Sequence, residues 1–183
     1  MKGMDRMKIS RMIGGLLLIV LSGVIAGTAF AASQKAVRPC FMSDLLGTWE
    51  MRNINAKVKI DPKDPFTWPY QRIAFDRKGD VKQVTSTTPI EGNKALIQRF
   101  NRMASTSKFT IDEGSILTIT KLESSNPERC MCSYAMKDLP AQVLAKLPES
   151  KRGQIPHQGD IVLTYVNRNG QPVLIKSFRK VQP

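Results

Sequence analysis

The chain has 183 residues, of which 42% are hydrophobic and 23% charged, and its formal net charge is +13. This length predicts one domain plus an appendage. The sequence contains no internal repeat and no low-complexity segment, which excludes repeat arrays.

The appendage is at the N-terminus. Residues 1–11 contain four Lys and Arg and one acid, an uncharged run follows over 12–32, and Ala29-Phe30-Ala31 matches the small-x-small cleavage rule. We predict a cleaved signal peptide over 1–31, and a periplasmic or secreted protein. The alternative is an uncleaved membrane anchor, because the run is about long enough to span a bilayer.

Positive charge remains after the leader is removed. The leader holds four bases and one acid, so its loss lowers the formal net charge from +13 to +10. Such a charge favours acidic partners, and we expect peripheral contact with an anionic membrane surface. The alternative is a basic protein without such a partner, since the bases form no run. Export argues against nucleic acid as a partner.

Eight segments have the composition and alternation of strands. They cover 48–54, 70–75, 81–88, 108–111, 116–122, 129–137, 160–166 and 172–181. Gly-containing turns at 76–80, 112–115 and 167–170 predict hairpins between three successive pairs. Sequential hairpins form an antiparallel meander, which closes as a barrel and so removes its exposed edges.

Two short helices interrupt this pattern. Apolar residues recur at spacings of three and four over 91–105, and 139–146 is a short helical insert between Pro140 and Pro148. A long loop with three Pro-associated breaks precedes the second strand, and a polar loop covers 149–159. The predicted fold is therefore mainly β: an eight-stranded antiparallel up-and-down barrel with two short helical insertions. The alternative is a β-sandwich or a flattened barrel.

Gly47-Thr48-Trp49 opens the first strand after a short apolar turn. With seven further strands, this resembles the lipocalin family and its calycin relatives, whose signature at this position is Gly-x-Trp. The resemblance implies that Arg179, in the last strand, packs across Trp49 and closes the barrel. It divides the mature chain into an N-terminal arm and turn, 32–46, and a lipocalin-like barrel domain, 47–183. We expect Gly47, Trp49 and Arg179 to be structural; the alternative is that the Trp and Arg line a binding site.

Three cysteines remain after export, in a compartment where disulfides form. Cys130 and Cys132 lie two apart in one strand, so both point to one face, and an extended strand holds their Cα atoms too far apart for a mutual bond. We expect a disulfide from Cys40 to Cys130 or to Cys132. A redox Cys-x-Cys, a metal site and no bond at all are the alternatives. The one histidine, His157, adds too few ligands for a metal, so none is expected.

Aromatic residues are the candidate ligand contacts. Phe66, Trp68 and Tyr70 end the first long loop, which in a barrel covers the mouth of the cavity. The alternative is that they pack on the rim. Candidate wall residues on the strands, most of them core in either case, are Met51, Ile73, Phe75, Leu117, Ile119, Tyr134, Met136, Leu163 and Tyr165. Of these, Phe75, Tyr134 and Tyr165 complete the predicted ligand site.

These features predict an exported lipocalin-like protein that binds a small hydrophobic or amphipathic ligand, such as a lipid or fatty acid. The alternative is a filled, non-catalytic barrel that docks on an envelope protein or an anionic lipid surface. Many strand positions are large and apolar, which favours a filled interior. We expect no cofactor and no enzymatic activity, because the sequence pairs His157 with no nucleophile and orienting acid.

Overall fold

The computed structural model describes residues 36–59, 61–124 and 126–181. The predicted signal peptide lies outside these residues, as does the start of the predicted arm. Nine strands are present within the described residues. They are β1 (Val37–Pro39), β2 (Gly47–Ala56), β3 (Tyr70–Phe75), β4 (Asp80–Ser86), β5 (Ser107–Ile111), β6 (Ile116–Lys121), β7 (Glu128–Ala135), β8 (Ile161–Val166) and β9 (Pro172–Val181).

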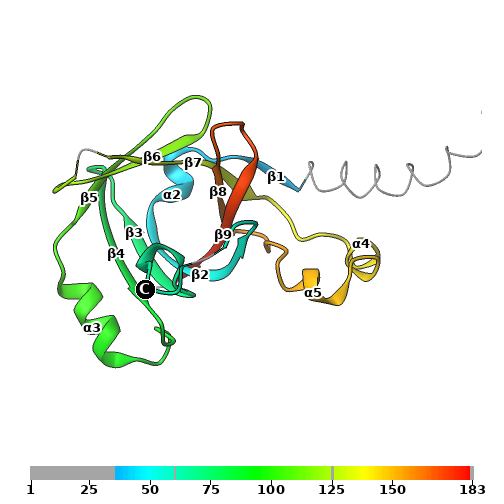
Figure 1. The fold of residues 1–183 in the computed structure, drawn as a ribbon, viewed down its shortest axis with the longest axis horizontal. Helices are drawn as coiled ribbons and strands as arrows, with labels where there is room; N and C mark the ends of the chain where they lie inside the picture. The colour runs from blue at the N-terminus through cyan, green and yellow to red at the C-terminus, as the bar shows by residue number, and fades with distance from the viewer. Residues whose placement is uncertain (1–35, 60, 125, 182–183) are drawn as a thin grey trace, which may run out of the picture.

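Eight of these strands form a closed barrel (Figure 1). From β2 to β9 each strand pairs antiparallel with the next, and β9 returns to pair with β2. The eight-stranded antiparallel up-and-down barrel is therefore confirmed, in preference to an open sandwich. β1 is an additional ninth strand, which pairs with β7.

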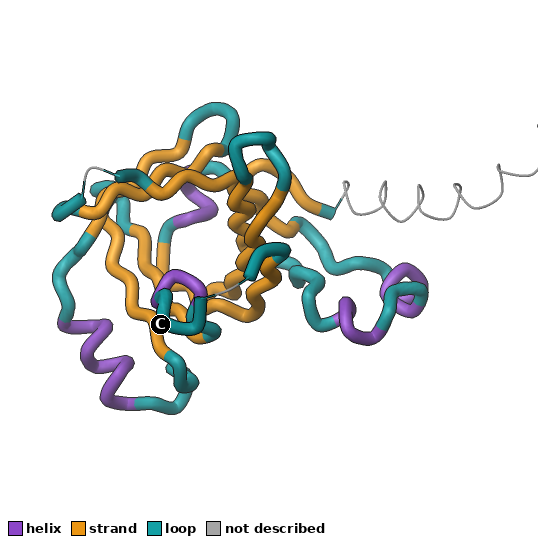
Figure 2. Tube along the Cα trace, viewed as in Figure 1, coloured by secondary structure: helices purple, strands orange, loops and turns teal. Residues whose placement is uncertain are grey.

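The helices are short and lie between strands (Figure 2). They are α2 (Met42–Leu45), the 3-10 turn η1 (Pro65–Thr67), α3 (Lys94–Arg102), α4 (Ala141–Ala145) and α5 (Glu149–Arg152). α3 and α4 are the two predicted insertions. The prediction of a polar loop over 149–159 was wrong at its start, because Pro148 begins the turn of α5. None of the helices in the described part of the chain is long and apolar enough to cross a bilayer.

One end of the barrel is closed by α2 and Trp49. The Trp49 indole N–H donates to the Leu45 carbonyl at 2.7 Å, and both side chains are fully buried. Gly47 has φ +117°, and a Cβ there would lie 3.0 Å from Lys180 Cε. Glycine is therefore required where the chain leaves α2 and enters β2.

The basic residue over Trp49 is Lys180 and not Arg179, which corrects the expectation from the lipocalin resemblance. Trp49 is opposite Lys180 in the β2–β9 register, and the Lys180 Nζ lies 5.4 Å from the indole centroid. Arg179 is opposite Glu50, on the other face of the sheet. It pairs there with Glu50 at 3.4 Å and with Glu91 at 2.5 Å.

The main core fills the closed half of the barrel. Its buried members are large or apolar side chains from α2 and from the barrel strands: Cys40, Leu45, Trp49, Met51, Ile73, Phe75, Val81, Phe109, Leu117, Ile119, Cys130, Cys132, Ile161, Leu163 and Phe178. Most of the predicted wall residues are among them. Met136 is an error, because it follows the end of β7 and is 42% exposed.

A second cluster joins α3 to the outer face of β3 and β4. Phe100 of α3 is 1% exposed and packs with Val84 and Ile90. The connection that contains α3 replaces the tight hairpin found at other junctions. β4 pairs with β5 at Asp80 and Val81, so the strands diverge beyond this point.

The N-terminal arm is tied to β7. β1 pairs with residues 133–135, beyond the part of β7 that pairs with β6. A disulfide joins Cys40 to Cys132, which confirms the expected link and identifies the partner. Cys130 is a free, buried thiol, and burial raises its pKa to about 12.

We expect the disulfide to be a large stabilising element. It joins residues 92 apart, and a loop of this length is worth about 4–5 kcal/mol on the chain-entropy model. Thiol titration of the unreduced, denatured protein should find one free group per chain. The same group should react slowly in the folded protein, because it is buried. Three free groups would contradict the assignment.

We also expect Trp49 to couple energetically with Lys180 rather than with Arg179. Trp49→Ala should lower the free energy of unfolding by about 3–5 kcal/mol, as a large buried side chain is lost. In urea, a double-mutant cycle with Lys180→Ala should give a coupling of about 0.5–1 kcal/mol, the size of an exposed cation–π contact. Arg179→Ala is the matched control. A stronger coupling of Trp49 to Arg179 would restore the expectation from the family resemblance.

Candidate ligand-binding site

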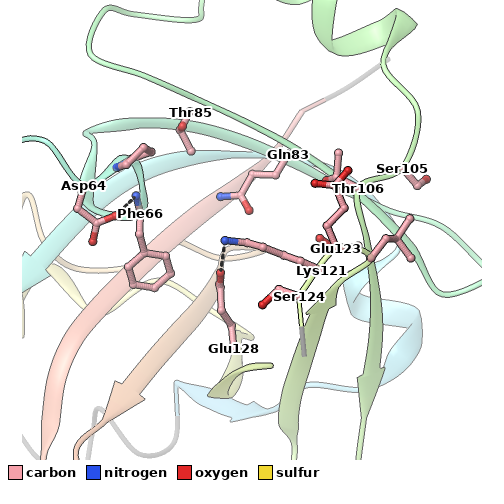
Figure 3. A pocket seen from close by; sticks show the side chains of 13 residues that line it. Asp64, Phe66, Gln83, Thr85, Ser105, Thr106, Lys121, Glu123, Ser124 and Glu128 are labelled. Atoms are coloured by element: carbon pink, nitrogen blue, oxygen red, sulfur yellow. Dashed lines mark hydrogen bonds and ion pairs between the residues drawn. The ribbon is translucent and has the colours of Figure 1, made fainter. Parts of the chain in front are cut away.

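A pocket of about 610 Å³ lies between η1, β4 and the connection from β6 to β7 (Figure 3). We call it the mouth pocket. It is lined by Asp64, Pro65, Phe66, Gln83, Thr85, Ser105, Thr106, Ser107, Lys121, Leu122, Glu123, Ser124 and Glu128. Most of these side chains carry hydroxyl, amide or charged groups, so the lining is polar with a few apolar residues.

The mouth pocket is open because two neighbouring strands separate. β4 diverges from β5 beyond Val81 and carries Gln83 and Thr85 on its inner face. The chain returns from α3 through residues 103–106 and completes the rim with serine and threonine hydroxyls. The long α3 connection thus creates a polar gap, which a two-residue hairpin would have closed.

One ion pair lies within the pocket. Lys121 at the end of β6 and Glu128 at the start of β7 point toward each other, with Nζ and Oε1 3.6 Å apart (Figure 3). The Lys121 side chain is 63% exposed. Each charge is therefore balanced by the other, and the pair adds polarity rather than net charge.

Phe66 covers the pocket from the side of η1. Asp64 caps this turn by accepting a hydrogen bond from the Phe66 N–H at 2.9 Å. Gln71, fully buried in β3, donates to the carbonyls of Phe66 and Trp68 at 2.8 and 3.0 Å. The side-chain amide of Gln71 thus holds η1 in place from inside the barrel.

A buried lysine lies beneath Phe66. Lys176 of β9 is 1% exposed, and its Nζ donates to the Phe66 carbonyl at 2.7 Å and to Gln71 Oε1 at 3.2 Å. The same Nζ lies 3.4 Å from the centroid of the Phe66 ring and 5.4 Å from that of Tyr165. Burial in this environment lowers the pKa of Lys176 to about 8, because desolvation penalises the ammonium form.

Of the six aromatic residues predicted to bind a ligand, the structure brings two together. The rings of Phe66 and Tyr165 meet edge to face, with centroids 5.0 Å apart. Phe66 lines the mouth pocket, and Tyr165 supports it from β8.

The other four lie elsewhere. Phe75 packs edge to face against Phe109 in the main core. Tyr70 belongs to the α3 cluster on the outer face. The Trp68 indole N–H donates to the Pro62 carbonyl in the loop, and Tyr134 lies beneath the Arg38 guanidinium at 4.7 Å. These four residues do not line the mouth pocket, and the sequence does not show where the loops fold back.

Sequence reasoning missed the polar residues of the site. The available signal was alternation: Leu174, Lys176 and Phe178 share the inward face of β9, so a charged residue interrupts an apolar series. Lys121 and Glu128 occupy inward positions in the same way. No group of three metal-ligating side chains occurs in the described ranges.

The buried lysine predicts how stability changes with pH. In the unfolded chain Lys176 keeps its ordinary pKa of 10.5, whereas in the folded protein it is about 8. The unfolded state therefore binds more protons between these values, and the free energy of unfolding rises with pH through this window. Relative to Lys176→Met, the wild type should gain about 2–3 kcal/mol between pH 7 and pH 10.

The measurement is urea unfolding of both proteins across that range. The titration of the surface lysines contributes equally to both proteins and therefore cancels in the comparison. The neighbouring Cys130 and Tyr165 have pKa values raised by burial, so they keep their protons there. A constant difference between the two proteins would show that Lys176 does not titrate in this window.

Comparisons with protein-family models, with curated proteins and with solved structures found no match to this chain. The fold and the mouth pocket therefore carry the functional argument by themselves.

Proposed function

We propose that the protein is an exported, lipocalin-like carrier that binds a small amphipathic molecule in the mouth of its barrel. The observation that carries the proposal is the mouth pocket, where hydroxyls, an amide and an aromatic ring converge on a volume of about 610 Å³. Concave sites of about 300–1,000 Å³ with a few convergent polar groups are typical of small-molecule binding.

The position of the core determines which part of the barrel is available. The closed half is filled by Trp49, Phe75, Phe109 and Phe178, all at most 3% exposed. A long acyl chain has no room there. The ligand that fits best is short, with an apolar part against Phe66 and polar groups toward Thr85 and the serine rim.

The predicted export of the protein agrees with a carrier role. The disulfide joining Cys40 to Cys132 is typical of an oxidising compartment. It agrees with the predicted leader over 1–31 and with a periplasmic or secreted carrier. Gly47 and Trp49, at the closed end, are the features that the barrel shares with the lipocalin signature.

A second candidate is a filled docking module without a ligand. The packed lower half of the barrel favours it, and the net charge would direct it toward an anionic lipid surface or an acidic envelope protein. We rank it second because it leaves the mouth pocket without a role.

The test is native mass spectrometry of protein purified from the organism that makes it. We expect a bound small molecule that is lost under collisional activation. Thr85→Trp should abolish the adduct, because the indole projects into the mouth pocket and obstructs it. Thr110→Trp places the same side chain on the exposed outer face of β5 and should retain the adduct.

Two outcomes would contradict the carrier proposal. One is an apo mass in every preparation, together with binding of the protein to anionic vesicles, which favours the docking module. The other is an adduct that survives in Thr85→Trp, which would place the ligand outside the mouth pocket.

A further inference from the structure

Over its second half, β4 has an edge that is not covered by another strand. β4 pairs with β3 from Val81 to Ser86, but with β5 only at Asp80 and Val81. In the described part of the chain, no further strand pairs with this edge. The barrel wall is therefore interrupted along residues 82–86, which we call the free edge of β4.

The backbone groups of Gln83 and Thr85 face this gap. In an antiparallel sheet, the N–H and C=O groups of successive residues alternate between the two edges of a strand. The Val81 carbonyl accepts a hydrogen bond from the Thr106 N–H at 2.9 Å, so residue 81 directs these groups toward β5. Gln83 and Thr85 continue this alternation beyond the last pairing with β5. Each presents one backbone donor and one backbone acceptor to the gap.

The mouth pocket lies along the free edge. Gln83 and Thr85 line it from β4, and Ser105 and Thr106 line it from the chain that returns from α3 (Figure 3). Unpaired strand edges pair readily with another extended chain, and folded proteins usually cover them. Here the edge borders a pocket of about 610 Å³, a volume that admits a small molecule or a few residues of an extended chain.

The lining of the pocket is acidic in a basic protein. Asp64, Glu123 and Glu128 line it against Lys121 alone, whereas the predicted mature chain has a formal net charge of +10. Glu128 pairs with Lys121, and the charges of the other two carboxylates have no base within the lining. The buried Lys176 lies outside the lining and offsets part of this charge. A ligand with a basic side chain would meet a complementary surface here.

We propose that the mouth pocket binds a short, extended peptide with basic side chains, which adds a strand to the free edge of β4. This inference rests on the proposed carrier function and specifies its ligand class. The peptide backbone pairs with Gln83 and Thr85, as in recognition by strand addition. Successive side chains of an extended peptide point to opposite faces, so an apolar side chain packs against Phe66 while its neighbours point away from it.

The probe is the pentapeptide acetyl-Leu-Lys-Leu-Lys-Leu-amide, which matches the length of the free edge. Isothermal titration calorimetry of the exported protein, with its disulfide formed, should detect binding. The counterpart with Glu in place of both Lys should bind about tenfold more weakly, because its carboxylates would approach Asp64 and Glu123. The net charge of the protein favours the Glu peptide, so equal or tighter binding of that peptide would overturn the charge assignment.

The alternation of the backbone gives a second test, which needs no protein variant. Two analogues of the Lys peptide carry one N-methyl group each, at the second or at the third residue. Adjacent N–H groups of an extended chain point to opposite edges, so only one of the two analogues loses a hydrogen bond to β4. That analogue should bind about tenfold more weakly than the parent peptide, and the other should bind like the parent. Equal affinities of the two analogues would overturn strand addition.

Thr85→Pro removes one backbone donor from the free edge. The pairing with β3 is retained, because the N–H of residue 85 points away from that strand. Peptide binding should weaken by about tenfold. Thr85→Val is the matched control, since it keeps the N–H and the shape of the side chain, and it should bind the peptide like the wild type. Equal losses in the two variants would assign the contact to the hydroxyl and overturn the backbone pairing.

The remaining outcomes separate this inference from the carrier proposal. A native adduct that is lost in Thr85→Trp but does not fragment at amide bonds would overturn the peptide assignment and leave the carrier function in place. A wild type that does not bind the Lys peptide would also overturn the peptide assignment. The carrier function itself is contradicted only by the outcomes of the native mass spectrometry given above.

Discussion

The pairing of β2 with β9 is the constraint on which the rest of the structure depends. It joins the first and last strands of the barrel over eight aligned positions, with one irregularity between Met51 and Asn53. Without it the sheet would have two open edges and no interior. The same register sets Lys180 beside Trp49 at the closed end and Lys176 opposite Ile54 toward the mouth.

The barrel interior therefore changes character along its axis. Near α2, inward positions carry aromatic and branched side chains that exclude water. Toward η1, the same alternation presents Gln71, Gln83, Lys121, Glu128 and Lys176. The apolar half supplies stability, and the polar half supplies a place where a ligand can be recognised. The α3 connection separates β4 from β5 and opens this second half to solvent.

The sequence predicted the strands well because their signals are local. β3 and β9 have the predicted limits, and the hairpins at Gly79 and Gly170 follow from turn residues with positive φ. The position of Arg179 was wrong because it came from a family pattern. Strict alternation from Phe178 would have directed Lys180 to the inner face. The mouth pocket could not be predicted from the sequence, since it depends on where three separate loops meet in space.

The two cysteines of β7 have a consequence for the order in which the protein matures. Cys130 and Cys132 face the same side of β7, so a chain that is oxidised before it folds offers both thiols to Cys40. The native choice depends on the docking of β1, whose end places the Cys40 N–H 3.2 Å from the Cys132 carbonyl. Correct oxidation is thus an outcome of folding, and a thiol-disulfide isomerase would have a substrate in any chain oxidised too early.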